Sequence, residues 1–572
     1  MSEPFLKKII APLPSSHGLI IAVATLAYTW FYYQEMLAGP LRLNDDVVQH
    51  YLWLFVDYFE LNWKDTFYAD ASAAIQPRGF YWLLWSFGRV FEPLTISRGG
   101  PFFISLLTVG FGVALLRRHT HILIAVAGSL LAVHLGLHSI VGFLARSFMI
   151  PLLLAFGYYL LRGDRPWGVA AVAVASALFY PPALLINGGI FGLWKLGELY
   201  FWGRGRGMQG EDEGSVRPVS PLQNWHVYFL GFGIALVVVL AHAHRVEVHP
   251  TLGGYLPNTE LLSRPEFGSD GRVNVRNALQ TPSLRLLEYF FVNTMKTPFG
   301  SWLAYAILLL TVLFTGLKKA PLGKVGGWLI SMGLVTVVLY FLARELFPLL
   351  FLPDRYVAYP WRLWAAMLFV FPLATAWSYY PKTWLAATFA ILLLAFGYYR
   401  QSPAELPTSS EEGREELFSA IAALPENALI VLPPHLAEHV PIFTHRNVFL
   451  SRESAHALYF RNYHAYIMPR YYDFVEAYTV TNGNLGEVVD FLDKWDIDYM
   501  IIDRNQLREG WLMSGFAPFQ RQLKTRLKGS ELSERTLLNL PDTTGYLIQD
   551  RLHLISREEL RGLYYTAVGH MR

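Results

Sequence analysis

Two adjacent carboxylates, Asp45 and Asp46, lie a few residues after the first long apolar run of the chain. Neighbouring carboxylates at an apolar surface repel each other unless they act as a base, bind a metal ion or cap a helix. The simplest interpretation is a cap, because Asn44 or Asp45 can cap the amphipathic stretch 47–59. Capping and catalysis are compatible, since a cap fixes the position of the side chain.

Further carboxylates follow among aromatic residues. Asp65 and Asp70 flank Phe67 and Tyr68, and Trp63 precedes them. Such an arrangement suits a sugar, whose apolar faces stack on aromatic rings while its hydroxyl groups bind carboxylates. The alternative is a belt of interfacial aromatic residues in a chain that is 15% aromatic.

A cluster of cations lies in residues 344–362. Arg355 and Arg362 are seven residues apart and would share one face of a helix, although Pro360 lies between them, and Arg344 precedes both. Guanidinium groups bind phosphate oxygens with a planar fork of donors, as a lipid-linked phosphate would require. The alternative is that these arginines only extend to the water layer at a membrane surface.

The composition indicates what kind of chain positions these residues. Of 572 residues, 53% are hydrophobic and only 16% are charged, against roughly 25% charged in soluble domains. Residues 401–572 hold 40 of the 91 charged residues, which leaves 51 for the first 400. We therefore expect a polytopic α-helical membrane domain over 1–400 and a soluble domain over 401–572. The net charge of +3 gives no indication of a nucleic-acid partner, and the lack of cysteine excludes disulfides.

About eleven membrane-spanning helices are expected, because a helix needs about 20 apolar residues to cross a bilayer. They are predicted at residues 18–37, 101–116, 121–142, 147–161, 167–184, 186–202, 225–243, 300–316, 326–343, 362–380 and 383–399. Tyr180-Pro181-Pro182 must bend or end the helix that contains it.

Lysine and arginine residues fall in alternate loops, on the side of the N-terminus: Lys7, Lys8, Arg117, Arg118, Arg162, Arg165, Arg204, Arg206, Lys318, Lys319, Lys324 and Lys382. By the positive-inside rule this side is cytoplasmic. The long loops 38–100 and 244–299 are then outside. An odd number of spans places residues 401–572 outside as well.

The tail is expected to fold as an extracytoplasmic α/β domain. Short apolar runs at 428–432, 447–450 and 499–502 indicate buried strands. Helical patterns at 409–424 and 485–495 alternate with them. Strands that alternate with helices are typical of a small α/β layer.

This layout resembles the GT-C superfamily of integral membrane glycosyltransferases, and within it uncharacterised bacterial members. The common features are a short N-terminal tail, one span, an acidic motif at the start of a long outer loop, about a dozen spans and an outer α/β domain. The motif that carries the resemblance is Asp45-Asp46. These enzymes use sugars linked to a polyprenyl phosphate or diphosphate. The resemblance implies that Asp45 or Asp46 is the general base that deprotonates the acceptor hydroxyl, with inversion at the anomeric carbon.

The resulting expectation is a glycosyltransferase of a bacterial inner membrane. The donor phosphate would be bound by Arg355, Arg362 and Arg344, and the residues expected to contact substrate are His50, Asp65, Tyr68, Asp70 and Tyr356. The lipid-linked sugar is a substrate, no metal ligands are nominated, and a divalent cation is left open. The acceptor is a glycan, a lipid or a protein, and a membrane-protein partner could dock on 401–572. Two alternatives stay open, namely a non-catalytic scaffold subunit and a transporter of lipid-linked saccharide.

Overall fold

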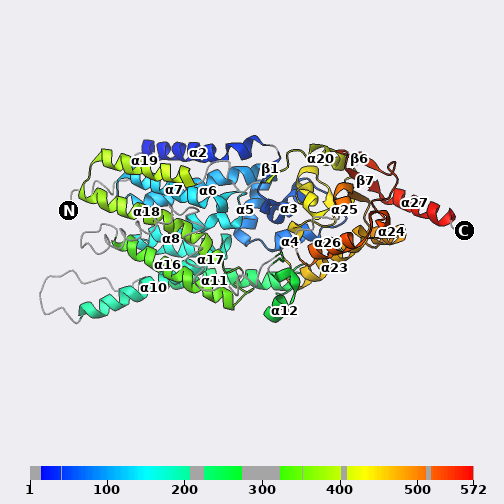
Figure 1. The fold of residues 1–572 in the computed structure, drawn as a ribbon. Helices are drawn as coiled ribbons and strands as arrows, with labels where there is room; N and C mark the ends of the chain where they lie inside the picture. Colours follow the sequence, from blue (N-terminus) through cyan, green and yellow to red (C-terminus); the bar gives the residue numbers. More distant parts are fainter. Residues whose placement is uncertain are drawn as a thin grey trace.

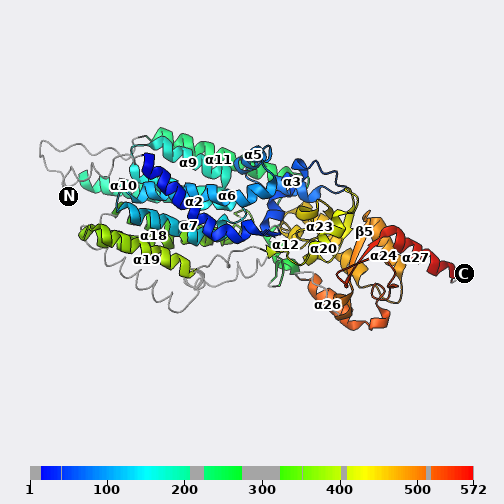
Figure 2. The ribbon, with the colours of Figure 1, turned by 90° about the horizontal axis from the view of Figure 1, so that it is seen from above.

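The computed structural model describes residues 15–39, 41–206, 224–268, 270–272, 323–350, 352–400, 409–509 and 517–570. The predicted span 300–316 and half of the predicted outer loop 244–299 lie outside the described residues. The molecule is elongated, with long helices side by side in one part and the five-stranded sheet in the other (Figure 1). Helix α10 and the turn between α18 and α19 reach the end that lies away from the sheet (Figure 2).

Helices occur where ten of the eleven spans were predicted. They are α2 (Ser15–Ala38), α6 (Pro93–Leu116), α7 (Ile122–Ile140), α8 (Met149–Arg162), α9 (Pro166–Phe179), α10 (Pro181–Arg206), α11 (Trp225–Val248), α16 (Gly323–Glu345), α18 (Pro360–Tyr379) and α19 (Thr383–Arg400). In the described part of the chain, five helical segments are long and apolar enough to cross a membrane: Pro93–Leu116, Ile122–Ile140, Trp225–Val248, Lys324–Glu345 and Arg355–Tyr379. The count of eleven crossings therefore stays a prediction.

Helix α11 shows why the outer surface of this part suits lipid. Its sequence is apolar from Val227 to Ala241, yet only 22% of its most apolar window is buried inside the molecule. Large side chains such as Phe229 and Val237 are exposed on it. A helix with an apolar face that meets no protein is expected to face a bilayer.

The bend predicted at Tyr180-Pro181-Pro182 is confirmed. Helix α9 ends at Phe179, Tyr180 is extended, and α10 begins at Pro181. Proline is tolerated at the first helical position, because its missing N–H would have no partner there. Helix α9 has 14 residues and is about 21 Å long, shorter than the ~30 Å core of a bilayer.

Three short helices follow α2 and form the first outer segment. They are α3 (Asp46–Tyr58), α4 (Phe67–Ala74) and α5 (Arg78–Gly88). Helix α3 buries one apolar face, and its N-cap is Asp45, whose carboxylate accepts a hydrogen bond from the N–H of Asp46 at 3.0 Å. Asn44 Oδ1 accepts from the same N–H at 3.2 Å. The predicted cap is thus confirmed, and it fixes where the two aspartates point.

Four short elements complete the connections within the helical part. They are η1 (Ala145–Phe148), α12 (Asn258–Ser263), η2 (Pro265–Phe267) and α17 (Arg355–Ala358). Helix α17 directly precedes α18, and both contact α16. Element η1 carries Arg146, and α17 begins at Arg355.

The tail contains a five-stranded sheet in the order β4-β3-β5-β7-β6. Its strands are β3 (Leu429–Val431), β4 (Asn447–Val448), β5 (Tyr499–Asp503), β6 (Tyr546–Ile548) and β7 (Leu552–Ser556). Strand β3 is parallel to β4 and β5, with Ile430 opposite Tyr499, and β7 is antiparallel to β5 and β6. The three predicted strands are confirmed.

Helices surround this sheet. They are α20 (Glu415–Ala422), α21 (Pro434–Ala437), α22 (Val440–Thr444), η4 (Glu453–Ala455), α23 (Arg461–Tyr478), α24 (Leu485–Lys494), α25 (Arg504–Glu509), α26 (Phe519–Gly529), η5 (Leu532–Glu534) and α27 (Arg557–His570). The predicted helix 485–495 is confirmed as α24.

The predicted helix 409–424 is wrong in its first residues. Ser409–Ser410 forms strand β2, which pairs antiparallel with β1 (Arg42–Leu43), and helix α20 begins only at Glu415. The N–H of Glu411 continues the pairing by donating to the carbonyl of Leu41 at 3.1 Å. Hydrogen bonds to β1, a strand distant in sequence, thus satisfy the backbone groups of residues that the sequence pattern predicted to be helical.

One hydrophobic cluster extends from Tyr32 of α2 to Leu560 of α27, so the helical part and the tail share a core. The first outer segment lies between them and makes specific contacts with the tail. Trp63 Nε1 donates to the carbonyl of His445 at 3.2 Å, and Lys64 Nζ pairs with Asp498 at 2.8 Å. The boundary near residue 400 stays a prediction, but the first outer segment and the tail are packed together.

Candidate functional site

Asp46 pairs with an arginine from the connection between α7 and α8. Asp46 begins α3, and Arg146 lies in η1, where α7 turns into α8. Arg146 Nη1 forms an ion pair with Asp46 Oδ2, and the two side chains are 12% and 25% exposed. Gln49 Nε2 donates to the other oxygen, Oδ1, at 3.3 Å. Both carboxylate oxygens of Asp46 are therefore engaged.

The charges around Asp46 determine its protonation. Burial raises its pKa, but Arg146, His50 and Arg355 outweigh burial and lower the pKa to about 2. Asp46 is thus ionised at neutral pH and is a weak proton acceptor, because a general base works best with a pKa near the operating pH. Arg355 is thus near enough to Asp46 to contribute to the lowering of its pKa.

Arg355 and Arg362 lie around one tyrosine. Arg355 Nη1 donates to the hydroxyl of Tyr359, and its guanidinium lies 5.4 Å from the centre of that ring. The guanidinium of Arg362 lies 6.0 Å from the same ring. Arg344 is in the last turn of α16, on a different element. Of the three predicted arginines, Arg355 is one of the residues that lower the pKa of Asp46, and a role of all three in binding phosphate stays a prediction.

Asp45 has a different environment from Asp46. It is exposed and acts as the cap of α3. Its negative charge raises the pKa of two carboxyl groups of the tail, Glu438 and Glu453, in each of which burial is the larger cause. Two aspartates that are adjacent in sequence thus face different partners.

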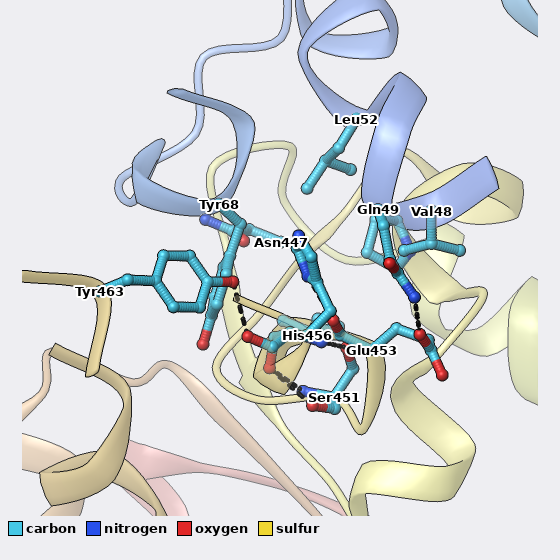
Figure 3. A pocket seen from close by; sticks show the side chains of 12 residues that line it. Val48, Gln49, Leu52, Tyr68, Asn447, Ser451, Glu453, His456 and Tyr463 are labelled. Carbon is cyan, nitrogen blue, oxygen red and sulfur yellow. Dashed lines mark hydrogen bonds between the residues drawn. The ribbon is translucent and has the colours of Figure 1, made fainter. Parts of the chain in front are cut away.

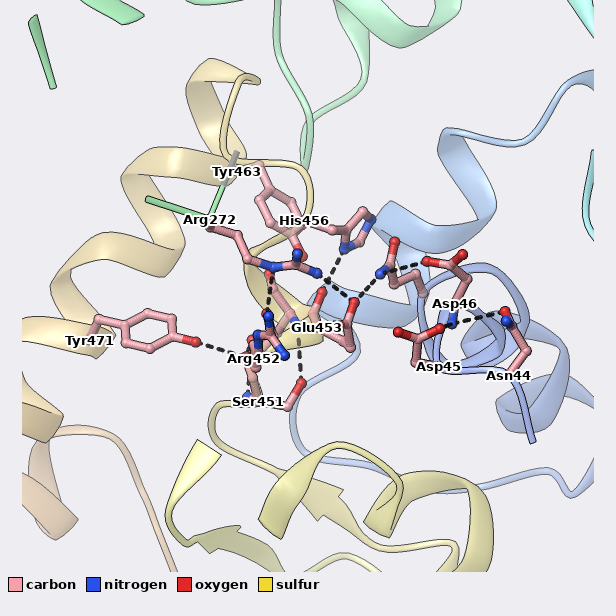
Figure 4. Close-up of polar contacts among 12 residues, drawn as sticks. Asn44, Asp45, Asp46, Arg272, Ser451, Arg452, Glu453, His456, Tyr463 and Tyr471 are labelled. Atoms are coloured by element: carbon pink, nitrogen blue, oxygen red, sulfur yellow. Dashed lines mark hydrogen bonds and ion pairs between the residues drawn. The ribbon is translucent and has the colours of Figure 1, made fainter. Parts of the chain in front are cut away.

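Glu453, in η4 of the tail, is a buried carboxylate close to Asp45 and Asp46 (Figure 4). Its side chain is 5% exposed, and its Oε2 accepts from Arg272 Nη2 at 2.6 Å and from Gln49 Nε2. Burial raises its pKa to about 7, because Arg272 only partly offsets burial and the nearby Glu438, Asp45 and Asp46 oppose ionisation. A carboxyl group with this pKa changes protonation near neutral pH.

A pocket lies between the first outer segment and the tail (Figure 3), and its volume is about 400 Å³ when the solvent at its open mouth is counted. Apolar side chains form much of its wall, together with Gln49, Tyr68, Glu453, His456 and Tyr463. Its lining residues are Val48, Gln49, Leu52, Tyr68, Pro441, Asn447, Val448, Ser451, Glu453, Ser454, His456 and Tyr463. The pocket therefore needs both parts of the chain.

Two histidines at the site are neutral. His50 Nδ1 lies 2.9 Å from Gln76 Nε2, and burial lowers the pKa of His50 to about 3. His456 Nδ1 lies 2.8 Å from the carbonyl oxygen of Glu453, so this nitrogen carries the hydrogen and donates it. Burial lowers the pKa of His456 to about 4.

Two predicted substrate contacts are engaged with the protein instead. Asp65 pairs with Arg470 at 2.7 Å, accepts from Tyr466 at 2.7 Å, and accepts from the N–H of Phe67, the first residue of α4, at 3.0 Å. The hydroxyl of Tyr68 donates to the carbonyl of Phe449 at 3.0 Å, although its ring lines the pocket.

Two further predicted contacts lie elsewhere. Asp70 is exposed and accepts from Thr66 Oγ1 at 3.1 Å. Tyr356 is buried and donates to the carbonyl of Leu350 at 3.0 Å. The role of these four residues and of His50 as substrate contacts stays a prediction.

Sequence reasoning missed most of the residues that surround Asp46. Arg146 was visible only as a cation at the outer end of a predicted span, and Arg272 only as part of a turn. No local sequence pattern marks Gln49, Glu453 or His456 as site residues. The hydrogen bond between Gln49 and Glu453 joins residues that are 404 apart in sequence. Among the described residues, no group of three His, Asp or Glu side chains is placed to hold a metal ion.

No protein-family model and no curated protein matches the chain. Among solved structures it is similar to the oligosaccharyltransferase of Archaeoglobus fulgidus in the apo form, with 12% identity, a TM-score of 0.48, and coverage of 86% of this chain and 70% of that one. The zinc and sulfate complex of that enzyme gives 11% identity, a TM-score of 0.46, and coverage of 88% and 70%.

The same enzyme in complex with an inhibitory peptide and a dolichol-phosphate gives 11% identity, a TM-score of 0.40, and coverage of 86% and 69%. This enzyme has a GT-C fold. With TM-scores below 0.5 and such low identity, the likeness does not by itself assign a family or an activity to this chain.

Proposed function

We propose that this protein is a membrane glycosyltransferase that takes a sugar from a polyprenyl-phosphate carrier and transfers it, with inversion, to an acceptor at the outer face of a bacterial inner membrane. The observation that carries the proposal is the pair of Arg146 and Arg355 beside Asp46, at the junction of apolar helices and the tail. Guanidinium groups at such a junction are suited to a phosphate that is attached to a lipid.

Arg146 has hydrogen-bonding capacity left for such a phosphate. It uses Nη1 on Asp46, and its buried Nε has no hydrogen-bond partner in the described part of the chain. A buried donor without a partner costs free energy, which a bound phosphate oxygen would recover. In this proposal Asp46 orients Arg146, and the two guanidinium groups stabilise the negative charge that develops on the leaving lipid phosphate.

A second candidate is a non-catalytic scaffold subunit whose tail docks a membrane-protein partner. It is favoured by the tight packing of the first outer segment against the tail, through Trp63, Lys64 and the Asp65–Arg470 pair. In this function the aspartates would only cap α3 and neutralise Arg146.

Mass spectrometry of the lipids that co-purify with the full-length protein separates the two. For the glycosyltransferase we expect a polyprenyl phosphate or its glycosylated form, reduced at least tenfold in the Arg146→Gln variant. The matched control is Arg162→Gln, since Arg162 pairs with Asp164 and Tyr158 instead of with site residues. Only bulk phospholipid with the wild type would contradict the proposal and favour the scaffold.

A further inference from the structure

We infer that the pocket between α3 and the tail binds the acceptor, and that Glu453 is the base that takes the proton from an acceptor hydroxyl. This inference rests on the proposed function and assigns to the tail the role that the sequence assigned to Asp45 or Asp46. It commits to one class of acceptor, a neutral molecule with hydroxyl groups such as a glycan.

Glu453 is held through one of its two oxygens. Two donors from different parts of the chain, Arg272 and Gln49, bind the same oxygen, Oε2. The second oxygen, Oε1, has no hydrogen-bond partner among the described residues, although the side chain is 5% exposed and lines the pocket. One oxygen is thus fixed in place while the other can accept a proton.

The donors of three side chains that line the pocket are already used. Gln49 donates to Glu453 and Asp46, Tyr68 to Phe449, and Tyr463 to Ser454. These three side chains therefore have little to offer to the acceptor atoms of a ligand.

By contrast, the lining offers free acceptors. His456 donates from Nδ1, so its Nε2 carries a lone pair, and this buried atom has no partner in the described part of the chain. With Glu453 Oε1 there are two acceptors, which fit a ligand that brings hydroxyl donors.

The charges around the pocket favour a neutral ligand. Glu453 faces Asp45 and Asp46 of α3, Glu438 before α22, and Arg272 of the second outer loop, with the neutral His456 beside it. Arg146 neutralises Asp46, and Arg452 acts on Glu438, so the described residues leave no surplus of positive charge to hold an anionic acceptor. A neutral glycan needs none.

The pocket lies close to the arginines that would bind the phosphate of the sugar donor. Gln49 Nε2 bridges Glu453 and Asp46, so a single amide separates the pocket from the Asp46–Arg146 pair. An acceptor in the pocket and a phosphate on the arginines would therefore be neighbours.

The reaction follows from this geometry. The acceptor O–H bond breaks and its proton moves to Glu453 Oε1. The acceptor oxygen forms a bond to the anomeric carbon of the donor sugar, and the bond from that carbon to the phosphate oxygen breaks. The lipid phosphate leaves with the electron pair beside Arg146 and Arg355, and Glu453 later returns its proton to water.

The test uses the full-length protein in nanodiscs and two readouts. Transfer is measured from a tritium-labelled lipid-linked sugar extract of the source cells to their cell-envelope fraction. Binding is measured separately with undecaprenyl phosphate, as a shift in the unfolding temperature. Glu453→Gln should lower transfer by about 10²–10⁴-fold, the usual contribution of a positioned base, and should leave the lipid-induced shift unchanged.

The matched control is Glu438→Gln, a partly buried carboxyl group of the same cluster that does not line the pocket. It should keep transfer within about threefold of the wild type, whereas equal transfer by Glu453→Gln would overturn the inference. A wild type that neither binds undecaprenyl phosphate nor transfers sugar would instead overturn the proposed function.

A labelling experiment tests Glu453 without any activity. Dicyclohexylcarbodiimide reacts with protonated carboxyl groups in apolar surroundings. Labelling of Glu453, read by peptide mass spectrometry, should be strong at pH 6 and should fall by half near pH 7, while Asp46 stays unlabelled. An unlabelled Glu453 at pH 6 would overturn the inference.

Discussion

At the scale of single residues, Asp45 and Asp46 show how neighbours in sequence can differ in role. Asp45 is an exposed helix cap, and Asp46 is the counter-charge of a largely buried arginine. The sequence could indicate that two carboxylates stand at this point. It could not indicate which of them faces Arg146, because that depends on the path of the chain 100 residues later.

Replacing Asp46 with Asn should lower the free energy of unfolding at pH 7 by about 1–3 kcal/mol, because Arg146 would keep its burial and lose its charged partner. Asp45→Asn should change it by only a few tenths of a kcal/mol, since Asn caps helices about as well as Asp. Denaturant unfolding in detergent, followed by tryptophan fluorescence, measures both. Equal effects would show that the Asp46–Arg146 pair contributes nothing specific.

The same pair predicts a pH dependence. The pKa of Asp46 is lowered in the folded protein to about 2, so its stabilisation is present above the unfolded value of about 4 and is lost as the pH falls from 4 towards 2. Unfolding of the wild type and of Asp46→Asn should therefore converge in this range and stay separate at pH 7. A constant difference from pH 7 to pH 2 would contradict this assignment.

Arg355→Lys should reduce sugar transfer at least tenfold, because a lysine keeps the charge and loses the planar fork that binds two phosphate oxygens. The matched control is Arg362→Lys, which contacts the ring of the same Tyr359 from α18. Initial rates with the labelled lipid-linked sugar extract measure the effect. If both variants transfer at the wild-type rate, the phosphate role of Arg355 fails.

At the scale of elements, the contact between α4 and α23 decides whether the first outer segment stays on the tail. Asp65 and Arg470 are 11% and 5% exposed, and the carboxylate also accepts from the N–H of Phe67 at the start of α4. We expect Asp65→Asn to cost about 3 kcal/mol of stability, since breaking a buried ion pair leaves a charge without its partner. Limited proteolysis between α3 and α4 should become faster.

The control for this substitution is Asp70→Asn, in the first turn of the same helix, where the side chain is exposed. It should change stability by less than about 0.5 kcal/mol, as is usual for surface positions. If Asp65→Asn instead leaves stability intact and raises the KM of transfer, then Asp65 contacts substrate, as its sequence neighbourhood suggested.

The elements that could be predicted are those whose signal is local. Strands β3 and β5 come from short apolar runs, and the break before α10 comes from Pro181. Strand β2 could not be found, because two serines have no apolar signal and are held only by Arg42–Leu43. Short helices such as α9 also show why the number of membrane crossings is hard to predict from the sequence. Such a helix is shorter than the hydrocarbon core of a bilayer.

At the scale of the whole molecule, we predict that a reporter fused after Arg400 is extracytoplasmic and that one inserted at 204–217 is cytoplasmic. Helix α10 and the turn between α18 and α19 reach one end of the molecule and the tail forms the other (Figures 1 and 2). A dual phosphatase–galactosidase reporter in bacteria measures the two positions. Reporters on the same side would contradict the orientation and place the candidate site at the wrong surface for an outer acceptor.

The site as a whole was predictable only in part. Its first half, Asp45-Asp46 followed by His50, is a local motif near a membrane surface. Its second half, Arg272, Glu453 and His456, consists of common residue types in ordinary surroundings. They form a site only when α3 packs against η4 and Gln49 donates a hydrogen bond to Glu453.

The short ladder between β1 and β2 has a consequence for biogenesis. Residues 42–43 leave the ribosome early, whereas their partners at 409–410 follow after nearly all the apolar helices. The backbone N–H and C=O groups of Arg42–Leu43 therefore stay unpaired until synthesis is almost complete. The partner of Gln49, Glu453, is synthesised later still, so a polypeptide that stops early would contain Asp46, Arg146 and Arg355 but not the pocket between α3 and the tail. Such a product would expose the unpaired edge of β1, a feature that membrane quality control could recognise.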